Sequence, residues 1–380
     1  MKRRTLLITA GLGAAAAATA AAHTAVGDRA EVPEVRDPMP GAAPATQDRL
    51  KVRTVAFWTG IYMRSWDFAY RNGTRLSRSE DSRDHYDLAY DVDGCAAMFR
   101  ATDQRRFLDR GLTFVENVVA SAKPSASLPD SQYRDGYQGW ESRKSGEGGD
   151  EVPLYESYFW RYATALLAAM HDSPAVIADA RYRSRYDRLL TFAEMQIFDK
   201  WYARGADDNI YRDRTHMAAH WALISLNLAR LTADAGRRAR YTTVADTIDA
   251  RLHLQMRRSP VEPTAYFWND VWDSAQRPGQ DVGHGNGVIA YVVEARDHGR
   301  SWTDADMAAF SALLTKVVWP GGTTYRAFVD GTGSDNGWFA DGFVKLGRYD
   351  PAVQLRLEQH RVVNDQFAAN MALNARILRS

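Results

Sequence analysis

The feature that most constrains the fold is an alternation of two kinds of helix along the chain from residue 47 onward. A helix that is apolar all round is surrounded by protein, whereas a helix with one charged face lies at the surface. We expect buried helices rich in Ala and aromatic residues over 84–101, 153–171, 213–233, 284–298 and 335–347. We expect helices with Arg and Glu on one side over 103–121, 175–200, 236–256, 303–317 and 351–378, and a further helix over 47–70.

This alternation predicts two concentric rings of helices, an all-α (α/α) toroid of six or seven inner–outer pairs. An open α-solenoid is the structural alternative, but no motif recurs at a fixed period. Residues 47–380 are therefore expected to form a single toroidal catalytic domain.

The start of the chain reads as a targeting segment. Residues 1–26 combine a charged beginning, an apolar stretch and small residues, as a secretory signal does. Arg3 and Arg4 directly precede the apolar run and resemble a twin-arginine signal. Residues 27–46 are rich in Pro and Ala and are expected to form a flexible leader. We expect a secreted, periplasmic or extracellular protein, and the lone Cys95 fits export without an internal disulfide.

Charge and composition limit the class of partner. The 48 basic and 47 acidic residues give a net charge of +1 with no long basic run, so nucleic acid is not expected. No membrane partner is expected either, and the oligomeric state is left open. Aromatic residues make up 11% of the chain, more than a core alone needs, and Tyr and Trp often line clefts that bind sugar rings.

Two histidines open one of the buried helices, in the stretch RDRTHMAAHW. His216 and His220 lie four residues apart and so share a face, and Asn227 continues this polar stripe. Hydrogen-bonded core histidines, a metal pair, and catalysis or carboxylate binding are the alternatives. A zinc site of the HExxH kind lacks its glutamate here and no third ligand is evident, so we expect no metal.

A second candidate is the glycine-flanked stretch DVGHGNG. Asp281, His284 and Asn286 lie where a helix begins, and a helix N-terminus favours an anion. Tyr291 follows His284 by seven residues, and Tyr266 follows His216 by fifty. The alternative is a helix cap with an ordinary histidine.

Further candidates lie in the loops and first turns before the buried helices, where a rigid scaffold commonly carries function. Each could instead be a cap, a stacked aromatic or a surface ion pair. The candidates for substrate binding are Trp140, Glu156, Trp160, Asn286, Tyr325 and Arg326, with Trp140 as a sugar platform.

These residue types favour elimination over hydrolysis. A glycoside hydrolase needs two carboxylates, and although Asp91, Glu156, Asp281 and Asp335 are available, no pair announces itself. A lyase needs His, Asn or Arg to neutralise a uronate carboxylate and Tyr or His as base and acid, with the tyrosine pKa lowered by a neighbouring cation. We expect His216, His220, Tyr266, His284 and Tyr291 to be catalytic, with no cofactor, on an anionic polysaccharide.

The motifs RTHMAAHW and DVGHGNG, with the twin-arginine-type leader, resemble the helical-barrel lyases of polysaccharide lyase family 38. The resemblance covers the chain from about residue 50 and implies a secreted lyase of alginate or glucuronan. It implies a His on an inner helix and a Tyr some fifty residues later, with an Asn beside the His, where this chain has Thr215. The alternatives are a glycoside hydrolase on the same toroid, including an unsaturated uronyl hydrolase, and a non-catalytic glycan-binding protein.

Overall fold

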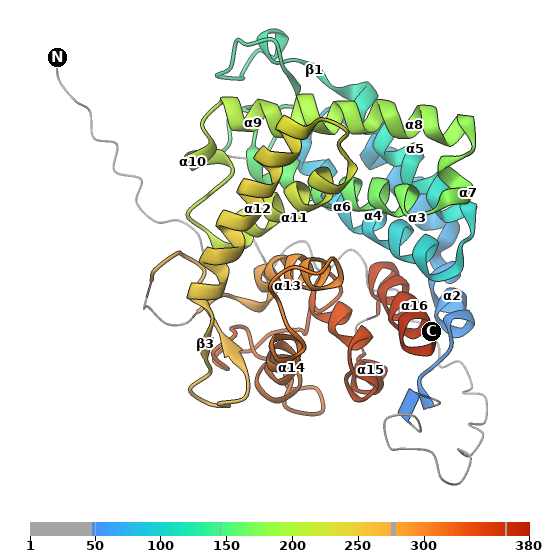
Figure 1. Cartoon of the computed structure of the whole chain (residues 1–380), viewed down its shortest axis with the longest axis vertical. Helices are drawn as coiled ribbons and strands as arrows, with labels where there is room; N and C mark the ends of the chain where they lie inside the picture. Colours follow the sequence, from blue (N-terminus) through green and yellow to red (C-terminus); the bar gives the residue numbers. More distant parts are fainter. Residues whose placement is uncertain (1–47, 50, 145, 275–278, 362) are drawn as a thin grey trace, which may run out of the picture. The chain divides into compact units, whose positions relative to one another are not determined.

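Six helical segments with largely buried surfaces form a closed inner ring in the described chain (Figure 1). They are α4 (Ser82–Thr102), α6 (Pro153–His171), α11 (Thr215–Leu231), α13 (Val282–Asp297), the 3-10 segment η6 (Phe343–Arg348) and α16 (Asp365–Arg379). Each segment contacts the next, and α16 returns to α4. This closure excludes the open solenoid and confirms the predicted all-α toroid.

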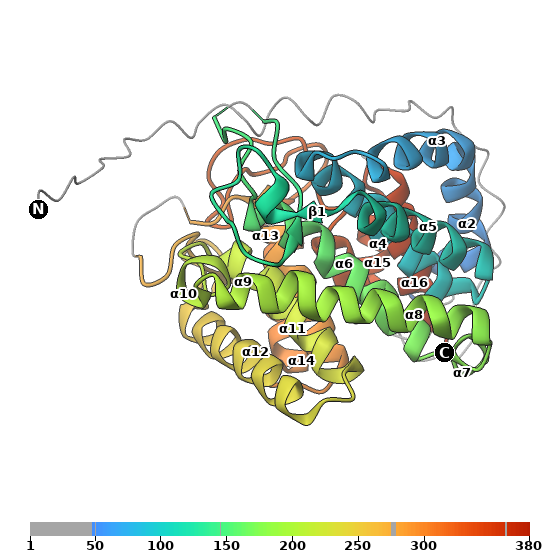
Figure 2. The same cartoon turned by 90° about the horizontal axis from the view of Figure 1, so that it is seen from above.

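An outer layer covers this ring and carries the charged surface. It comprises α2 (Val55–Tyr62), η2 (Met63–Ser65), α3 (Trp66–Ser77), α5 (Arg105–Ser121), α7 (Pro174–Ile177), α8 (Ala180–Phe192), the π-helical η4 (Ala193–Asp199), α9 (Lys200–Ala203), α10 (Ala206–Asn209), α12 (Ala235–Gln255), α14 (Asp304–Ala312), the π-helical η5 (Leu313–Val318) and α15 (Pro351–Leu357). Figure 2 shows α12 running along the outside of α11, whereas α8 contacts α5 and α6.

This computed structural model describes residues 48–49, 51–144, 146–274, 279–361 and 363–380. All of them belong to the compact unit from Arg36 to Ser380, and only this unit is considered. The predicted signal (1–26) and leader (27–46) lie outside the described residues. No helix of the described chain is long and apolar enough to cross a membrane.

Strands are short and confined to the loops between helices. β1 (Lys123–Pro124) pairs antiparallel with β2 (Gln138–Gly139), with Lys123 opposite Gly139. β3 (Arg257–Arg258) pairs antiparallel with β4 (Tyr266–Phe267), with Arg257 opposite Phe267. The first ladder closes the loop between Lys123 and Gly139, and the second closes the loop between Arg257 and Phe267.

Three of the expected helices differ from the structure. The surface helix expected over 351–378 is two helices, α15 and α16, and α16 belongs to the inner ring. The first helix, expected over 47–70, turns into 3-10 geometry at Met63–Ser65 and continues to Ser77. The segment expected over 335–347 is helical only from Phe343. The cause is visible at Gly337, which has a φ of +78° with the Tyr325 ring packed where a side chain would stand.

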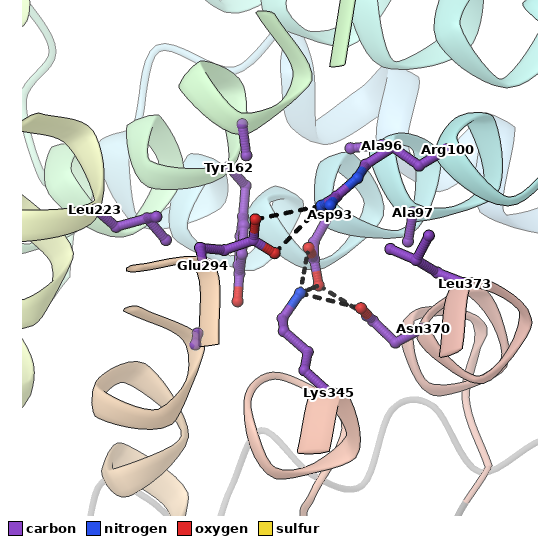
Figure 3. Close-up of a pocket in the computed structure, with 12 residues that line it drawn as sticks. Asp93, Ala96, Ala97, Arg100, Tyr162, Leu223, Glu294, Lys345, Asn370 and Leu373 are labelled. Atoms are coloured by element: carbon purple, nitrogen blue, oxygen red, sulfur yellow. Dashed lines mark hydrogen bonds and ion pairs between the residues drawn. The ribbon is translucent and has the colours of Figure 1, made fainter. Parts of the chain in front are cut away.

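The axis of the ring is nearly filled where the six inner segments meet. A cavity of about 10 Å³, room for about one water, is lined by residues from all six inner segments. Lys345 donates to Asp93 and Asn370, and Arg100 donates to Glu294 (Figure 3). These matched charges fill the axis at this level.

Candidate functional site

Polar and aromatic side chains come together from the N-terminal halves of the inner helices. Inward-facing positions recur at helical spacing, for example His216, His220 and Leu223 on α11. The loop before η6 completes the set. We call it the mouth cluster: Tyr86, Tyr90, Tyr158, Arg161, His216, His220, Asp281, His284, Trp338 and Asp341.

The rings of the three predicted histidines lie next to one another. The rings of His216 and His284 are 4.4 Å apart between centroids, and those of His216 and His220 are 6.0 Å apart. His220 continues to Tyr158, whose ring centroid is 5.1 Å away and nearly perpendicular. The sequence therefore identified one side of the cluster, contributed by α11 and α13.

Asp281 and His284 form a pair at the start of α13. Asp281 is the N-cap residue and accepts the backbone N–H of His284 at 2.9 Å, and its Oδ2 lies 2.8 Å from His284 Nδ1. Although burial lowers the pKa of His284, the hydrogen bond and charge of Asp281 raise it above its usual value. Burial opposes ionisation of Asp281, but its bonds to His284 bring its pKa down to about 2. The pair therefore favours the protonated form of His284.

His216 and His220 behave in the opposite way. Burial and then the charge of His284 lower the pKa of His216 well below its usual value. Burial and then the charge of Arg161 do the same for His220. Both rings are therefore neutral at neutral pH. Among the described residues, no group of three His, Cys, Asp or Glu side chains is arranged to hold a metal ion.

A buried ion pair forms the opposite side of the cluster. Arg161 donates to Asp341 Oδ2 at 2.7 Å, and the Tyr158 hydroxyl lies 3.1 Å from the same oxygen. The side chains of Arg161 and Asp341 are 0% and 2% exposed. Burial and then the charge of Asp341 hold the pKa of Tyr158 well above its usual value, so this tyrosine keeps its proton.

Five buried polar atoms of the cluster have no hydrogen-bond partner among the described residues: His216 Nδ1, His216 Nε2, His220 Nδ1, Arg161 Nη1 and Asp341 Oδ1. Leaving a buried polar atom unpaired costs about 1–3 kcal/mol, so such atoms are rare and call for a functional explanation. They belong to three different elements that meet at one place. This concentration makes the cluster the candidate binding site.

Aromatic rings with partly exposed faces lie beside these atoms. Tyr86 stacks on Tyr158 at 3.8 Å, with the ring planes inclined by 19°. Tyr90 lies edge-on to Trp338 at 6.0 Å. Tyr86 stacks on Tyr158 and the Arg83 guanidinium lies 4.5 Å from its ring centroid, so its ring is occupied by protein. Tyr90 and Trp338 are half-buried and offer flat apolar surface of the kind that sugar rings stack on.

The two tyrosines expected as base and acid lie elsewhere. Tyr266 belongs to β4, donates to Asp306 at 2.5 Å and packs on Phe310; burial and Asp306 raise its pKa to about 12. Tyr291 points from α13 toward α12, where its hydroxyl donates to Asp249 at 3.0 Å. Burial and Asp249 raise its pKa well above the usual value.

Three of the expected substrate-binding residues are structural instead. Trp140 is 1% exposed and donates to Ser121, so it is no open sugar platform. Trp160 is fully buried and stacks on Phe192. Glu156 lies in the interior, where it accepts from Lys200 at 2.8 Å.

Of the remaining three expected residues, Tyr325 and Arg326 lie in the loop before η6 and Asn286 lies in α13. Tyr325 is buried and its hydroxyl lies 3.2 Å from His360 Nδ1. Arg326 is half-buried and its backbone N–H donates to Val318. Asn286 is fully buried, and its amide bonds to backbone groups.

Sequence reasoning did not select Arg161, Asp341 or the Tyr86 and Tyr90 pair. Tyr86 and Tyr90 repeat the four-residue spacing of His216 and His220, and this repetition on another inner helix was a usable signal. Asp341 lies in a turn without periodicity, so no comparable pattern points to it.

No protein-family model and no curated protein matches the chain. Three solved structures match, all of GH76A alpha-1,6-mannanase from Salegentibacter sp. HEL1_6; two are inactive variants in complex with alpha-1,6-mannotetrose and alpha-1,6-mannotriose. Each is 12% identical, covers 83% of this chain and has a TM-score of 0.44. Matches at this level carry no argument about activity.

The expectation of an alginate or glucuronan lyase is corrected. The matched structures are mannanases and include no lyase. Within the site, the tyrosine beside the histidines is Tyr158, and its raised pKa is the reverse of what a tyrosine base requires. Tyr266 and Tyr291 are bonded to outer-layer carboxylates, which also raise their pKa values.

Proposed function

We propose that this chain is a glycoside hydrolase that cleaves a neutral glycan at the mouth cluster. The observation that carries the proposal is Asp341, a buried carboxylate with one oxygen held by Arg161 and Tyr158 and the other without a partner among the described residues. Glycoside hydrolysis needs a carboxylate together with a proton donor. The partly exposed rings of Tyr90 and Trp338 supply a surface for the sugar.

In this proposal His284 is the proton donor. Its Nδ1 faces Asp281, which leaves Nε2 to protonate the glycosidic oxygen as the C–O bond breaks. Asp341 stabilises the positive charge that develops on the sugar ring, and water supplies the hydroxyl at the new reducing end. His284 is returned to its protonated form by the proton that this water releases.

The charge balance of the cluster supports a neutral substrate. Its two cations, Arg161 and protonated His284, each face a carboxylate, Asp341 and Asp281. His216 and His220 are neutral because burial lowers their pKa values. Arg212 lies nearby, but its donors are directed at the Asp208 carbonyl and Met217 Sδ. A uronate would therefore meet no unmatched cation within the cluster.

The test is release of reducing ends from neutral polymers such as mannan, xylan and dextran, with alginate and glucuronan assayed in parallel. We expect cleavage of a neutral polymer by the native chain and loss of at least about 100-fold in kcat for D341N. D335N is the matched control because Asp335 lies in the same loop, half-buried, and bonds to Asn336. Glycan binding without cleavage, or full activity of D341N, would overturn the proposal.

A further inference from the structure

One side chain ties the Asp341 loop to the helix that carries His284. Asn286 Oδ1 accepts the backbone N–H groups of Gly342 at 2.9 Å and Phe343 at 3.1 Å. Its Nδ2 donates to the Trp338 carbonyl at 2.8 Å. An asparagine amide has two donor hydrogens and one oxygen with two lone pairs, so both lone pairs and at least one donor are committed to this loop. The bonds fall on both sides of Asp341.

Gly342 completes the contact by its lack of a side chain. A Cβ at this position would lie 2.0 Å from the carbonyl oxygen of Asn286 and 2.8 Å from its Cα. Backbone atoms cannot yield by that much, so only glycine lets the loop approach the helix this closely. The same turn of α13 contains Gly287, where a Cβ would lie 2.8 Å from His220 Nε2.

We propose that Asn286 is a positioning residue that sets the separation between Asp341 and His284, a role that rests on the proposed hydrolase. His284 lies two residues before Asn286 and is fixed by the cap Asp281. The backbone around Asp341 is fixed by Asn286 and Gly342. A single helical turn therefore determines where both the proton donor and the carboxylate stand.

This placement explains why a buried polar residue is kept on an otherwise apolar stretch of α13. The Asp341 side chain alone is held by Arg161 and Tyr158, which belong to α6. Without Asn286 the Asp341 carboxylate would be held only by side chains of α6. Its distance to His284 on α13 would then no longer be fixed. A misplacement of about 1 Å can cost about 100-fold in rate.

The test compares N286A with N374A. Asn374 is an equally buried asparagine whose amide donates to the Val344 carbonyl of η6 and to Gln354, so it holds neighbouring backbone without holding Asp341. We expect N286A to lower kcat by at least about 10-fold with KM changed less than about 3-fold, and N374A to lower only the unfolding temperature. Amide hydrogen exchange at Gly342 and Phe343 should accelerate in N286A alone.

N286D adds a readout that a purely structural role would not move. A charged aspartate cannot donate to the Trp338 carbonyl, whereas a protonated one can, so activity relative to the native chain should rise as pH falls. Unchanged exchange in N286A, or kcat within about 3-fold of native, overturns the positioning role even if the native chain is a hydrolase. A native chain without hydrolytic activity overturns the proposed function itself, and the positioning role with it.

Discussion

The rings of His216 and His284 lie 4.4 Å apart and are inclined by 31°, although they come from different inner helices. Asp281 favours the charged form of His284, whereas burial and the charge of His284 disfavour the charged form of His216. Of the two rings, His284 therefore holds a proton more tightly than His216.

The first prediction concerns pH. The folded pKa of His284 lies above its unfolded value, so the proton donor persists above about pH 6.5 and is lost as pH rises through the raised pKa. D281N keeps a capping residue but removes the charge, and should shift the basic limb of the activity profile to lower pH. Titration of His284 by NMR in both proteins checks this; equal values would contradict it.

The same pair predicts a modest effect on stability. His284 stabilises the fold fully below its unfolded pKa of about 6.5, and Asp281 stabilises it above its unfolded pKa of about 3.9. The loss of unfolding free energy in D281N, relative to the native chain, should therefore be largest between about pH 3.9 and 6.5. This loss should become smaller as pH rises through the folded pKa of His284. Both side chains are more than a third exposed, so we expect less than about 1 kcal/mol. Urea unfolding across pH measures it.

Gly287 gives a second prediction, since it is the point where α13 approaches α11 and α6. An alanine methyl would lie 2.8 Å from His220 Nε2 and 3.3 Å from Arg161 Nη1. G287A should cost about 1–3 kcal/mol through overpacking, despite the better helix propensity of alanine. G60A is the control, because a Cβ there meets nothing within 4 Å and should stabilise α2 by about 0.5–1 kcal/mol. Equal midpoints of urea unfolding for both would refute the close approach.

The buried ion pair gives a third prediction. R161M leaves Asp341 without its cation in the interior and should cost about 3–5 kcal/mol. R161M/D341L replaces both charges with apolar groups and should recover most of that loss while remaining inactive. If the double variant is no more stable than R161M, the pair is not the source of the cost.

Glu156 gives a fourth prediction, which separates structure from binding. E156Q removes the carboxylate charge that pairs with Lys200, whose side chain is 0% exposed. We expect it to lower the free energy of unfolding by about 1–3 kcal/mol and to leave KM unchanged. E80Q is the control: Glu80 pairs with Lys123 at the surface, and its loss should leave the unfolding midpoint unchanged. A raised KM for E156Q at native stability would return Glu156 to the binding site.

The alternation of buried and amphipathic helices was enough to predict the toroid, because a helix buried on all sides is apolar all round whereas a surface helix has one charged face. Spacing likewise predicted that His216 and His220 share a face, and the glycine-flanked turn pointed to His284. What spacing could not predict is the direction of Tyr291, which follows His284 by seven residues yet points to Asp249 on α12.

Pairings across long separations were also beyond prediction. Glu156 looked available for substrate because its partner Lys200 comes 44 residues later and is recognisable only once both are buried. Asp341 lies in a turn whose shape depends on the amide of Asn286, 56 residues earlier at Gly342. Local patterns carry no information about such contacts, so the carboxylate side of the site appears only in the structure.

The most direct test of the account is the chemistry of bond cleavage. A neutral glycan that the native chain cleaves should be digested in heavy-oxygen water and the products weighed by mass spectrometry. The account predicts one solvent oxygen in each new reducing end and no unsaturated product. D341N should release no product that carries the solvent oxygen. Products that lack the solvent oxygen and absorb in the ultraviolet would show elimination and contradict it.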